Sequence, residues 1–188
     1  MKSLFSLLMV IALVSLASCK DEIKKSEVTS ETQTKEVSTK RQGQAFVKDD
    51  EARPTVLTVA INSPDHTTLV AAVQAAELEN VLVNTGPLMV FAPTNDAFNA
   101  LPEGTVENLL KPENKGQLAF ILKHHVTPGN YSKDFLKKFK SLGQASNENI
   151  TVEVVGDDVF VGGAKILASV PAGNGIVHVV DKVILPEN

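Results

Sequence analysis

Residues 90–98 read Val-Phe-Ala-Pro-Thr-Asn-Asp-Ala-Phe and decide the fold of this chain. They complete an apolar run over residues 88–92, which has the length and composition of a buried strand. Pro93 has no backbone N–H to donate and ends that strand. Thr94 is a residue type that caps helix N-termini, and apolar residues follow it at helical spacing. The stretch therefore predicts a buried strand that leads directly into a helix.

The residues before this stretch predict an extended segment and two helices. Residues 55–60 are rich in β-branched side chains, which favours a strand or an extended lead-in. Ser63-Pro64-Asp65 supplies residues typical of a helix start, and apolar side chains then recur at helical spacing as far as Ala76. Residues 78–82 predict a second short helix, and Thr85-Gly86-Pro87 ends it.

The residues after the stretch change from helical to strand periodicity. Helices are expected at residues 105–110 and 112–122, and a short helical turn at residues 135–139. From residue 150 to residue 180 the apolar residues follow a period of two and predict a series of strands. Helices in the first half and strands in the second half indicate the α+β fold class.

The composition excludes several classes of protein. The chain has 188 residues, 18 basic and 22 acidic, so it lacks the basic balance of a protein that tracks nucleic-acid phosphates. Tyr131 is the single tyrosine and tryptophan is absent, so aromatic platforms for bases or sugars are scarce. Cys19 is the single cysteine, which excludes a disulfide framework and a multi-cysteine metal site. We expect no nucleic-acid partner, no metal and no cofactor.

The N-terminal part of the chain predicts an export signal, a lipid anchor and a tether. Residues 1–18 are typical of a signal peptide, because Lys2 precedes an apolar run too short to span a membrane. The run ends in Leu16-Ala17-Ser18-Cys19, which resembles the lipobox of bacterial lipoproteins, where the new N-terminal cysteine is acylated. A signal peptide with a chance cysteine is the alternative. Residues 19–53 are then the acylated cysteine and a disordered, charged tether, and residues 54–188 form the folded domain.

The residues directly after Cys19 bear on the location of the protein. Lys20-Asp21-Glu22 resembles the signal that sends lipoproteins of some Gram-negative groups to the outer cell surface. We therefore expect a lipid-anchored protein of the outer membrane, exposed at the cell surface. A position facing the periplasm is the alternative.

Four stretches of the folded domain form a set in a fixed order. They are residues 90–98, residues 104–110, residues 121–129 and residues 174–184. In this order and at this spacing, the set resembles the fasciclin (FAS1) domain family. The resemblance implies a β-sandwich or wedge of about seven strands with several short helices packed along it. It also implies a secreted or membrane-tethered protein of cell adhesion or matrix contact, in a family without a common catalytic activity.

The first of these stretches contains four residues of interest. Thr94 is expected to cap the helix and Phe98 to lie in the core. Asn95 or Asp96 is expected to hold the turn after the strand through side-chain to backbone hydrogen bonds. Contact of Asn95 and Asp96 with a partner is the alternative.

Three histidines lie in the later stretches. His178 is expected on a buried strand, with a structural hydrogen bond to the backbone or to a side chain such as Asp181, and ligand binding is the alternative. His124 and His125 stand where family members commonly have Tyr-His, and they are candidates for partner binding. In some animal members that tyrosine region is associated with integrin binding, an activity not transferred here because His124 replaces the tyrosine. Neighbouring strand residues point to opposite faces, so the pair is not expected to chelate a metal.

The expected function is that of a non-enzymatic, membrane-anchored lipoprotein that displays one fasciclin domain and binds a macromolecule. The chain has no nucleophile elbow, no zinc-helix motif and no glycine-rich phosphate loop, so we expect no enzyme. The expected partner is a protein or polysaccharide of the matrix or of a neighbouring cell surface. The alternatives are a periplasmic small-ligand or lipid-binding protein, which a closed apolar cavity would favour, and an envelope structural protein.

Overall fold

The computed structural model describes residues 53–186, so the predicted signal peptide, Cys19 and nearly all of the predicted tether lie outside the described residues. The α-helices within this range are α1 (Val56–Ile61), α2 (Thr67–Ala75), α3 (Glu79–Asn84), α4 (Asn95–Asn99), α5 (Thr105–Leu109), α6 (Lys115–His124) and α7 (Lys133–Leu136), with short 3-10 helices at Pro64–His66 and Pro112–Asn114. The strands are β1 (Leu88–Pro93), β2 (Val126–Pro128), β3 (Ser141–Gly143), β4 (Asn149–Val155), β5 (Asp158–Val161), β6 (Ala164–Ala172) and β7 (Gly175–Val180). None of the helices described is long and apolar enough to cross a membrane.

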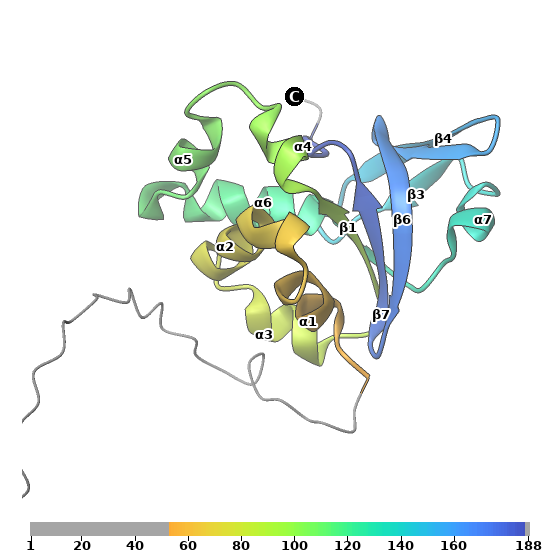
Figure 1. The fold of residues 1–188 in the computed structure, drawn as a ribbon, viewed down its shortest axis with the longest axis horizontal. Coiled ribbons are helices and arrows are strands. Elements are labelled where there is room, and N and C mark those ends of the chain that lie inside the picture. The colour runs from red at the N-terminus through yellow and green to blue at the C-terminus, as the bar shows by residue number, and fades with distance from the viewer. Residues whose placement is uncertain (1–52, 187–188) are drawn as a thin grey trace, which may run out of the picture. The chain divides into compact units, whose positions relative to one another are not determined.

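The strands form one sheet in the order β2-β1-β7-β6-β5-β4-β3. β1 pairs in parallel with β7, and the other neighbours in the sheet are antiparallel. The sheet curls until its two ends meet, where the Ala145 N–H after β3 donates to the Val126 carbonyl of β2 at 2.7 Å. Helices α1, α2, α3 and α6 lie on one side of β1 and β7, and α7 lies on the other side (Figure 1). The predicted α+β class, with seven strands and several short helices, is confirmed.

The stretch at residues 90–98 folds as predicted. β1 ends at Pro93, α4 begins at Asn95, and Thr94 is the N-cap between them. The Thr94 Oγ1 accepts a hydrogen bond from the Ala97 N–H at 3.3 Å. Phe98 packs among partly buried apolar residues on the helical side of the sheet.

Residues 56–61 form helix α1, so the predicted strand or extended lead-in at residues 55–60 is wrong. Thr55 caps the helix, with its Oγ1 accepting from the Thr58 N–H at 3.2 Å. Val56, Leu57 and Ala60 form a buried face of the helix. Burial of this face outweighs the weak helix propensity of β-branched side chains, because propensity is smaller than the free energy gained by packing.

The turn between β6 and β7 connects the sheet to the helices. The Asn174 Oδ1 accepts from the Val56 N–H at 2.9 Å, and the Asn174 Nδ2 donates to the Leu82 carbonyl at 2.7 Å. The start of α1 and the end of α3 are thereby attached to the same side chain. Gly175 follows, where a Cβ atom would lie 1.8 Å from the Leu88 carbonyl oxygen, so the parallel pairing of β1 and β7 requires glycine here.

Successive residues of β1 and β7 point into two separate apolar clusters, as the period of two in a strand requires. The sheet-side cluster consists of Met89, Phe91, Leu136, Leu142, Ile150, Val152, Val159, Val161, Ala164, Ile166, Ile176, Val180 and Ile184. The helix-side cluster consists of Val56, Leu57, Leu69, Ala72, Val73, Ala76, Ala92, Leu118, Leu122 and Val177. The candidate site residues are distributed around these two clusters.

Candidate functional site

Asn95 joins the start of α4 to the start of α2. Its Oδ1 accepts hydrogen bonds from the Thr68 N–H at 3.1 Å and from the Thr67 hydroxyl at 3.2 Å, and its Nδ2 donates to the Pro64 carbonyl at 3.0 Å. The side chain therefore holds two helix starts together, whereas the sequence predicted that it would hold the turn after β1. Asp96 is exposed on α4 and remains a candidate for partner contact.

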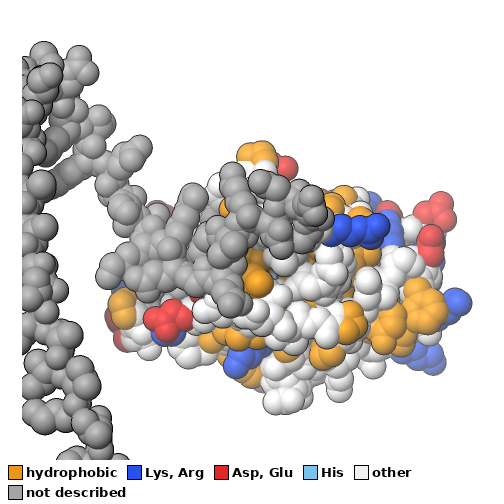
Figure 2. All heavy atoms as spheres, turned by 90° about the horizontal axis from the view of Figure 1, so that it is seen from below, with side chains coloured by type: hydrophobic (Ala, Val, Ile, Leu, Met, Phe, Trp, Pro, Cys, Tyr) orange, Lys and Arg blue, Asp and Glu red, His pale blue; other side chains and the backbone are white. Residues whose placement is uncertain are grey.

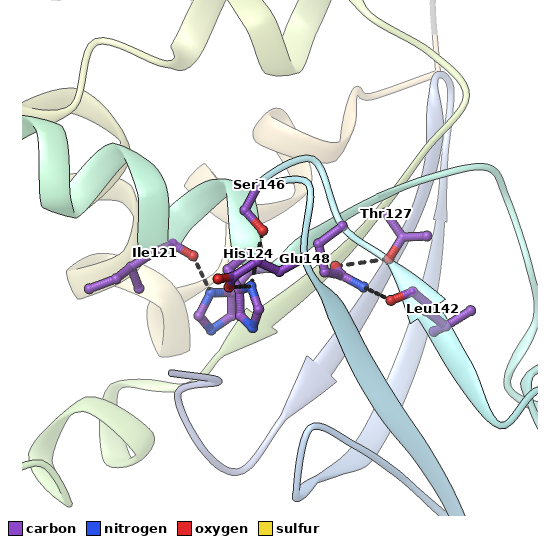
Figure 3. A network of polar contacts seen from close by, with 8 residues as sticks. Ile121, His124, Thr127, Leu142, Ser146 and Glu148 are labelled. Carbon is purple, nitrogen blue, oxygen red and sulfur yellow. Dashed lines mark hydrogen bonds and ion pairs between the residues drawn. The ribbon is translucent and has the colours of Figure 1, made fainter. Parts of the chain in front are cut away.

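His124 and His125 lie at the end of helix α6, and each residue is only 3% exposed. The expectation that they are neighbours on a strand is therefore wrong. The His124 Nδ1 lies 3.0 Å from the Ser146 Oγ and 3.2 Å from the Glu148 Oε2, as Figure 3 shows. Burial lowers the pKa of His124, and the Glu148 carboxylate opposes this effect.

The contacts of His124 differ from those of a catalytic triad. In a triad, the serine and the carboxylate approach opposite nitrogens of the imidazole, so a proton can pass through the ring. Here Ser146 and Glu148 both approach Nδ1, so the ring does not stand between them. Next to this group, the Thr127 hydroxyl donates to the Gln144 Oε1 at 3.0 Å (Figure 3). The network thus connects α6 and β2 to the segment between β3 and β4.

His125 uses both of its ring nitrogens inside the domain. Its Nδ1–H donates to the Ile121 carbonyl at 2.8 Å, and its Nε2 accepts from the Ile184 N–H at 2.9 Å. The second bond requires an unprotonated Nε2, so the imidazole is neutral. Burial lowers the pKa of His125 to about 4, in agreement with this pattern.

His178 is fully buried on β7, as the sequence predicts. Its Nε2–H donates to the Tyr131 carbonyl at 2.9 Å, and its Nδ1 accepts from the Ser169 hydroxyl at 2.7 Å. Burial lowers the pKa of His178. Asp181, suggested by the sequence as a partner for this ring, instead accepts from the Lys165 N–H at 2.7 Å.

The fourth histidine, His66, lies in no motif that the sequence points to. It is 5% exposed, and its Nδ1 lies 2.8 Å from the Ser63 Oγ. Burial lowers the pKa of His66 as well. Among residues 53–186, no three His, Cys, Asp or Glu side chains are grouped so that they could hold a metal ion.

Three aromatic rings lie on and around α7, on the side of β1 and β7 opposite helices α1, α2, α3 and α6 (Figure 1). The Phe135 ring stacks on Tyr131 with 5.5 Å between centroids and meets Phe139 edge-on at 5.5 Å. Phe135 is 41% exposed, and the Lys138 Nζ lies 4.9 Å from the centroid of its ring. We call this surface, with the lysines of residues 133–140, the α7 patch. Composition predicted that aromatic platforms are scarce, and the described residues bring these three rings together at one place.

The α7 patch is basic although the domain is acidic. Residues 133–140 carry four lysines and one aspartate, whereas residues 54–188 carry nine basic and fourteen acidic side chains. Lys137 pairs with Asp134 at 3.0 Å, and Lys138 and Lys140 are exposed. Figure 2 shows hydrophobic and basic side chains next to one another at the end of the domain where Figure 1 places α7. The sequence predicted only a helical turn here, because nothing in the spacing shows that Tyr131 meets the two phenylalanines.

Comparison with known proteins agrees with this architecture. Residues 64–186 match the family model described as the fasciclin domain. Protein sll1483 of Synechocystis sp. (strain ATCC 27184 / PCC 6803 / Kazusa) is 47% identical over 133 residues, which cover 70% of this chain and 73% of that protein. Immunogenic protein MPB70 of Mycobacterium bovis is 33% identical over 136 residues, covering 70% of this chain and 68% of that protein.

Among solved structures, the FAS1 domain pair of the insect cell adhesion molecule Fasciclin I matches with a TM-score of 0.48 at 21% identity. The match covers 60% of this chain and 42% of that one. The family model covers the part of the chain that holds the strand-to-helix stretch, the α6 histidines and His178. This chain belongs to the fasciclin domain family.

Proposed function

We propose that this protein is a non-enzymatic binding protein, held on the outer membrane through acylated Cys19, whose fasciclin domain attaches to an acidic polysaccharide of the matrix or of a neighbouring cell. The α7 patch is the observation that supports this proposal. Its partly exposed Phe135 offers apolar surface to a sugar, and its lysines offer ammonium groups to carboxylates. Other parts of the domain have less support as the binding site for an acidic polysaccharide, because the rest of the domain is acidic.

The strength of such an interaction follows from its parts. An exposed ion pair contributes about 0–1 kcal/mol and weakens as salt rises, so one domain binds a polyanion weakly. Many copies on one membrane bind the same polymer together and raise the overall affinity by about 10²–10⁴. A lipid anchor and a tether that holds the domain away from the membrane suit this mode of binding.

The buried histidines support a role without catalysis. The ring nitrogens of His125 and His178 all bond within the domain, and His124 lacks the geometry of a triad. A general base has to reach a bound substrate, which buried and bonded imidazoles do not do.

The anchor and the location are tested on cells. Cys19→Ala should move the protein from the membrane fraction to the soluble fraction, and continued sedimentation with membranes would overturn the anchor. Protease added to intact cells should remove the domain before lysis if it faces outward. Protection until lysis would place the domain in the periplasm and would remove an extracellular matrix as its partner.

The α7 patch is tested by binding to a polyuronate, for which alginate is the probe and neutral dextran the control. Lys138→Gln with Lys140→Gln should weaken binding to alginate about fivefold or more, and Phe135→Ser should weaken it further. The matched control is Lys111→Gln with Lys182→Gln, which removes the same charge from exposed lysines outside residues 133–140. An equal loss in both double variants, or no binding to alginate, would overturn the proposal.

A further inference from the structure

A cavity of about 330 Å³ lies between helices α1, α2 and α3 and the beginning of β1. Its floor includes buried side chains of these elements, among them Val56 and Val73. Its mouth includes exposed residues, among them Val81, which is 53% exposed, and Lys123 of α6. The cavity therefore connects the helix-side cluster with solvent.

The walls of this cavity are almost entirely apolar. The polar side chains among the residues that line it are Thr85, Lys123 and His125, and both nitrogens of His125 are already bonded to Ile121 and Ile184. Water gains few hydrogen bonds in such a space, and an apolar cavity of about 150 Å³ can remain dry and bind benzene. The present cavity is about twice that size, so it has room for an apolar chain of about a dozen carbons.

The charge at the mouth selects among apolar ligands. Lys123 is the one charged residue among those lining the cavity, and no carboxylate of residues 53–186 forms an ion pair with it. An ammonium beside an apolar opening favours a molecule with an anionic head and an apolar tail. The volume suits one chain and not the two chains of a phospholipid, and one ammonium matches one carboxylate.

We infer that this cavity binds a fatty acid with a chain of about twelve carbons, with its acyl chain against the helix-side cluster and its carboxylate beside Lys123. This site is separate from the α7 patch, since none of the residues lining the cavity belongs to residues 131–140. Fatty-acid binding is therefore a second activity, and it does not depend on attachment to a polysaccharide.

Calorimetry tests the affinity and the role of the charge. The full chain carrying Cys19→Ala, freed of lipid, is titrated with dodecanoate below its micelle concentration, and one molecule per chain should bind. Lys123→Glu should weaken binding of dodecanoate about fivefold or more, whereas 1-dodecanol should bind this variant and its parent equally. Lys111→Glu, an exposed lysine outside the cavity, should leave both affinities unchanged and serves as the matched control.

Methyl NMR and a variant with a filled cavity test where dodecanoate binds. Dodecanoate should shift the methyl signals of Val56 and Val73, and leave those of Val159 in the sheet-side cluster in place. Ala60→Phe adds a ring inside the cavity and should abolish binding of dodecanoate while the domain stays folded. If Ala60→Phe does not fold, Val70→Phe makes the same test, because Val70 also lines the cavity.

Three results would overturn the inference. They are the absence of dodecanoate binding, methyl shifts confined to the sheet-side cluster, and a loss of dodecanol affinity in Lys123→Glu equal to the loss for dodecanoate. Binding of alginate by Lys123→Glu should match that of its parent, so failure at this cavity and failure at the α7 patch are distinguishable.

Discussion

The two apolar clusters of this domain are buried to different degrees. In the sheet-side cluster seven members, among them Met89, Phe91 and Ile166, have no exposed surface. In the helix-side cluster only Ala92 has none, many of its neighbours are partly buried, and a cavity of about 330 Å³ lies against it. One side of the sheet is therefore close-packed, and the other side leaves space.

The difference follows from the elements that build each side. Strands hold each other through backbone hydrogen bonds, and their branched side chains interlock at close range. Helices α1, α2, α3 and α6 of the other side have between six and ten residues, and alanines such as Ala72 and Ala76 take part in their contacts and fill less space than larger side chains. Helices this short are marginal alone and depend on tertiary contacts, such as those of Asn174 with α1 and α3. The apolar cavity thus lies on the side of the sheet that these short helices cover.

Deletion of a side chain should show the largest contrast between the two sides. Ile166→Ala removes a fully buried side chain from the close-packed cluster and should lower the free energy of unfolding by about 4 kcal/mol. Leu82→Ala, a partly buried residue that lines the cavity, should lower it by about 1 kcal/mol. Urea unfolding measures both values, and similar losses would contradict the difference in packing.

Acid should destabilise the domain through His125, which connects the two sides. Its pKa falls from 6.5 to about 4 on burial, so in this range the unfolded chain binds the proton and the folded chain does not. Stability that is present above pH 6.5 should therefore be lost as the pH falls toward 4, by about 3 kcal/mol from this group.

Urea unfolding at pH 7.5, 5.5 and 4.5 measures this effect in the parent chain and in His125→Gln. The slope of stability against pH should be smaller in the variant, because glutamine does not titrate. His178→Gln makes the same change on the sheet side and should also reduce the slope, because burial lowers the pKa of that histidine as well. An unchanged slope in His125→Gln would show that other groups account for the loss in acid.

Asn174→Ala should separate the helices from the sheet. The change removes the acceptor of the Val56 N–H and the donor to the Leu82 carbonyl, at a cost of about 2 kcal/mol. The substitution should raise the hydrogen-exchange rates of α1 and α3 much more than those of β4 and β5. Uniform acceleration across both sides would mean that the two clusters unfold as one unit.

The helix caps should show the smallest effects. Thr94→Ala and Thr55→Ala each remove a hydroxyl that accepts from a helix N–H, and each should destabilise by about 1 kcal/mol. Thermal unfolding measures the total effect, and hydrogen exchange at Thr58 and Ala97 shows whether each loss is local. The loss from Thr55 should be confined to α1, while the loss from Thr94 should extend to β1.

The regular elements could be predicted where local chemistry and burial agree. Strand β1, the cap at Thr94 and the alternating residues of β4 all carry signals in consecutive residues. Residues 56–61 lack that agreement, since their β-branched side chains favour a strand while the cap at Thr55 and the contact with Asn174 favour a helix. Asn174 is far away in sequence, so no local pattern reports it.

Sequence alone determined the α+β class with helices ahead of most strands, the family to which the chain belongs, and the burial of His178, because each depends on residue type and short spacing. Tertiary structure alone decided the parallel pairing of β1 with β7, the place of His124 and His125 at a helix end, and the two candidate surfaces. The physical reason is the same in each case. The α7 patch and the apolar cavity beside α1, α2 and α3 arise where side chains from separate elements meet, and such contacts depend on packing that no local periodicity encodes.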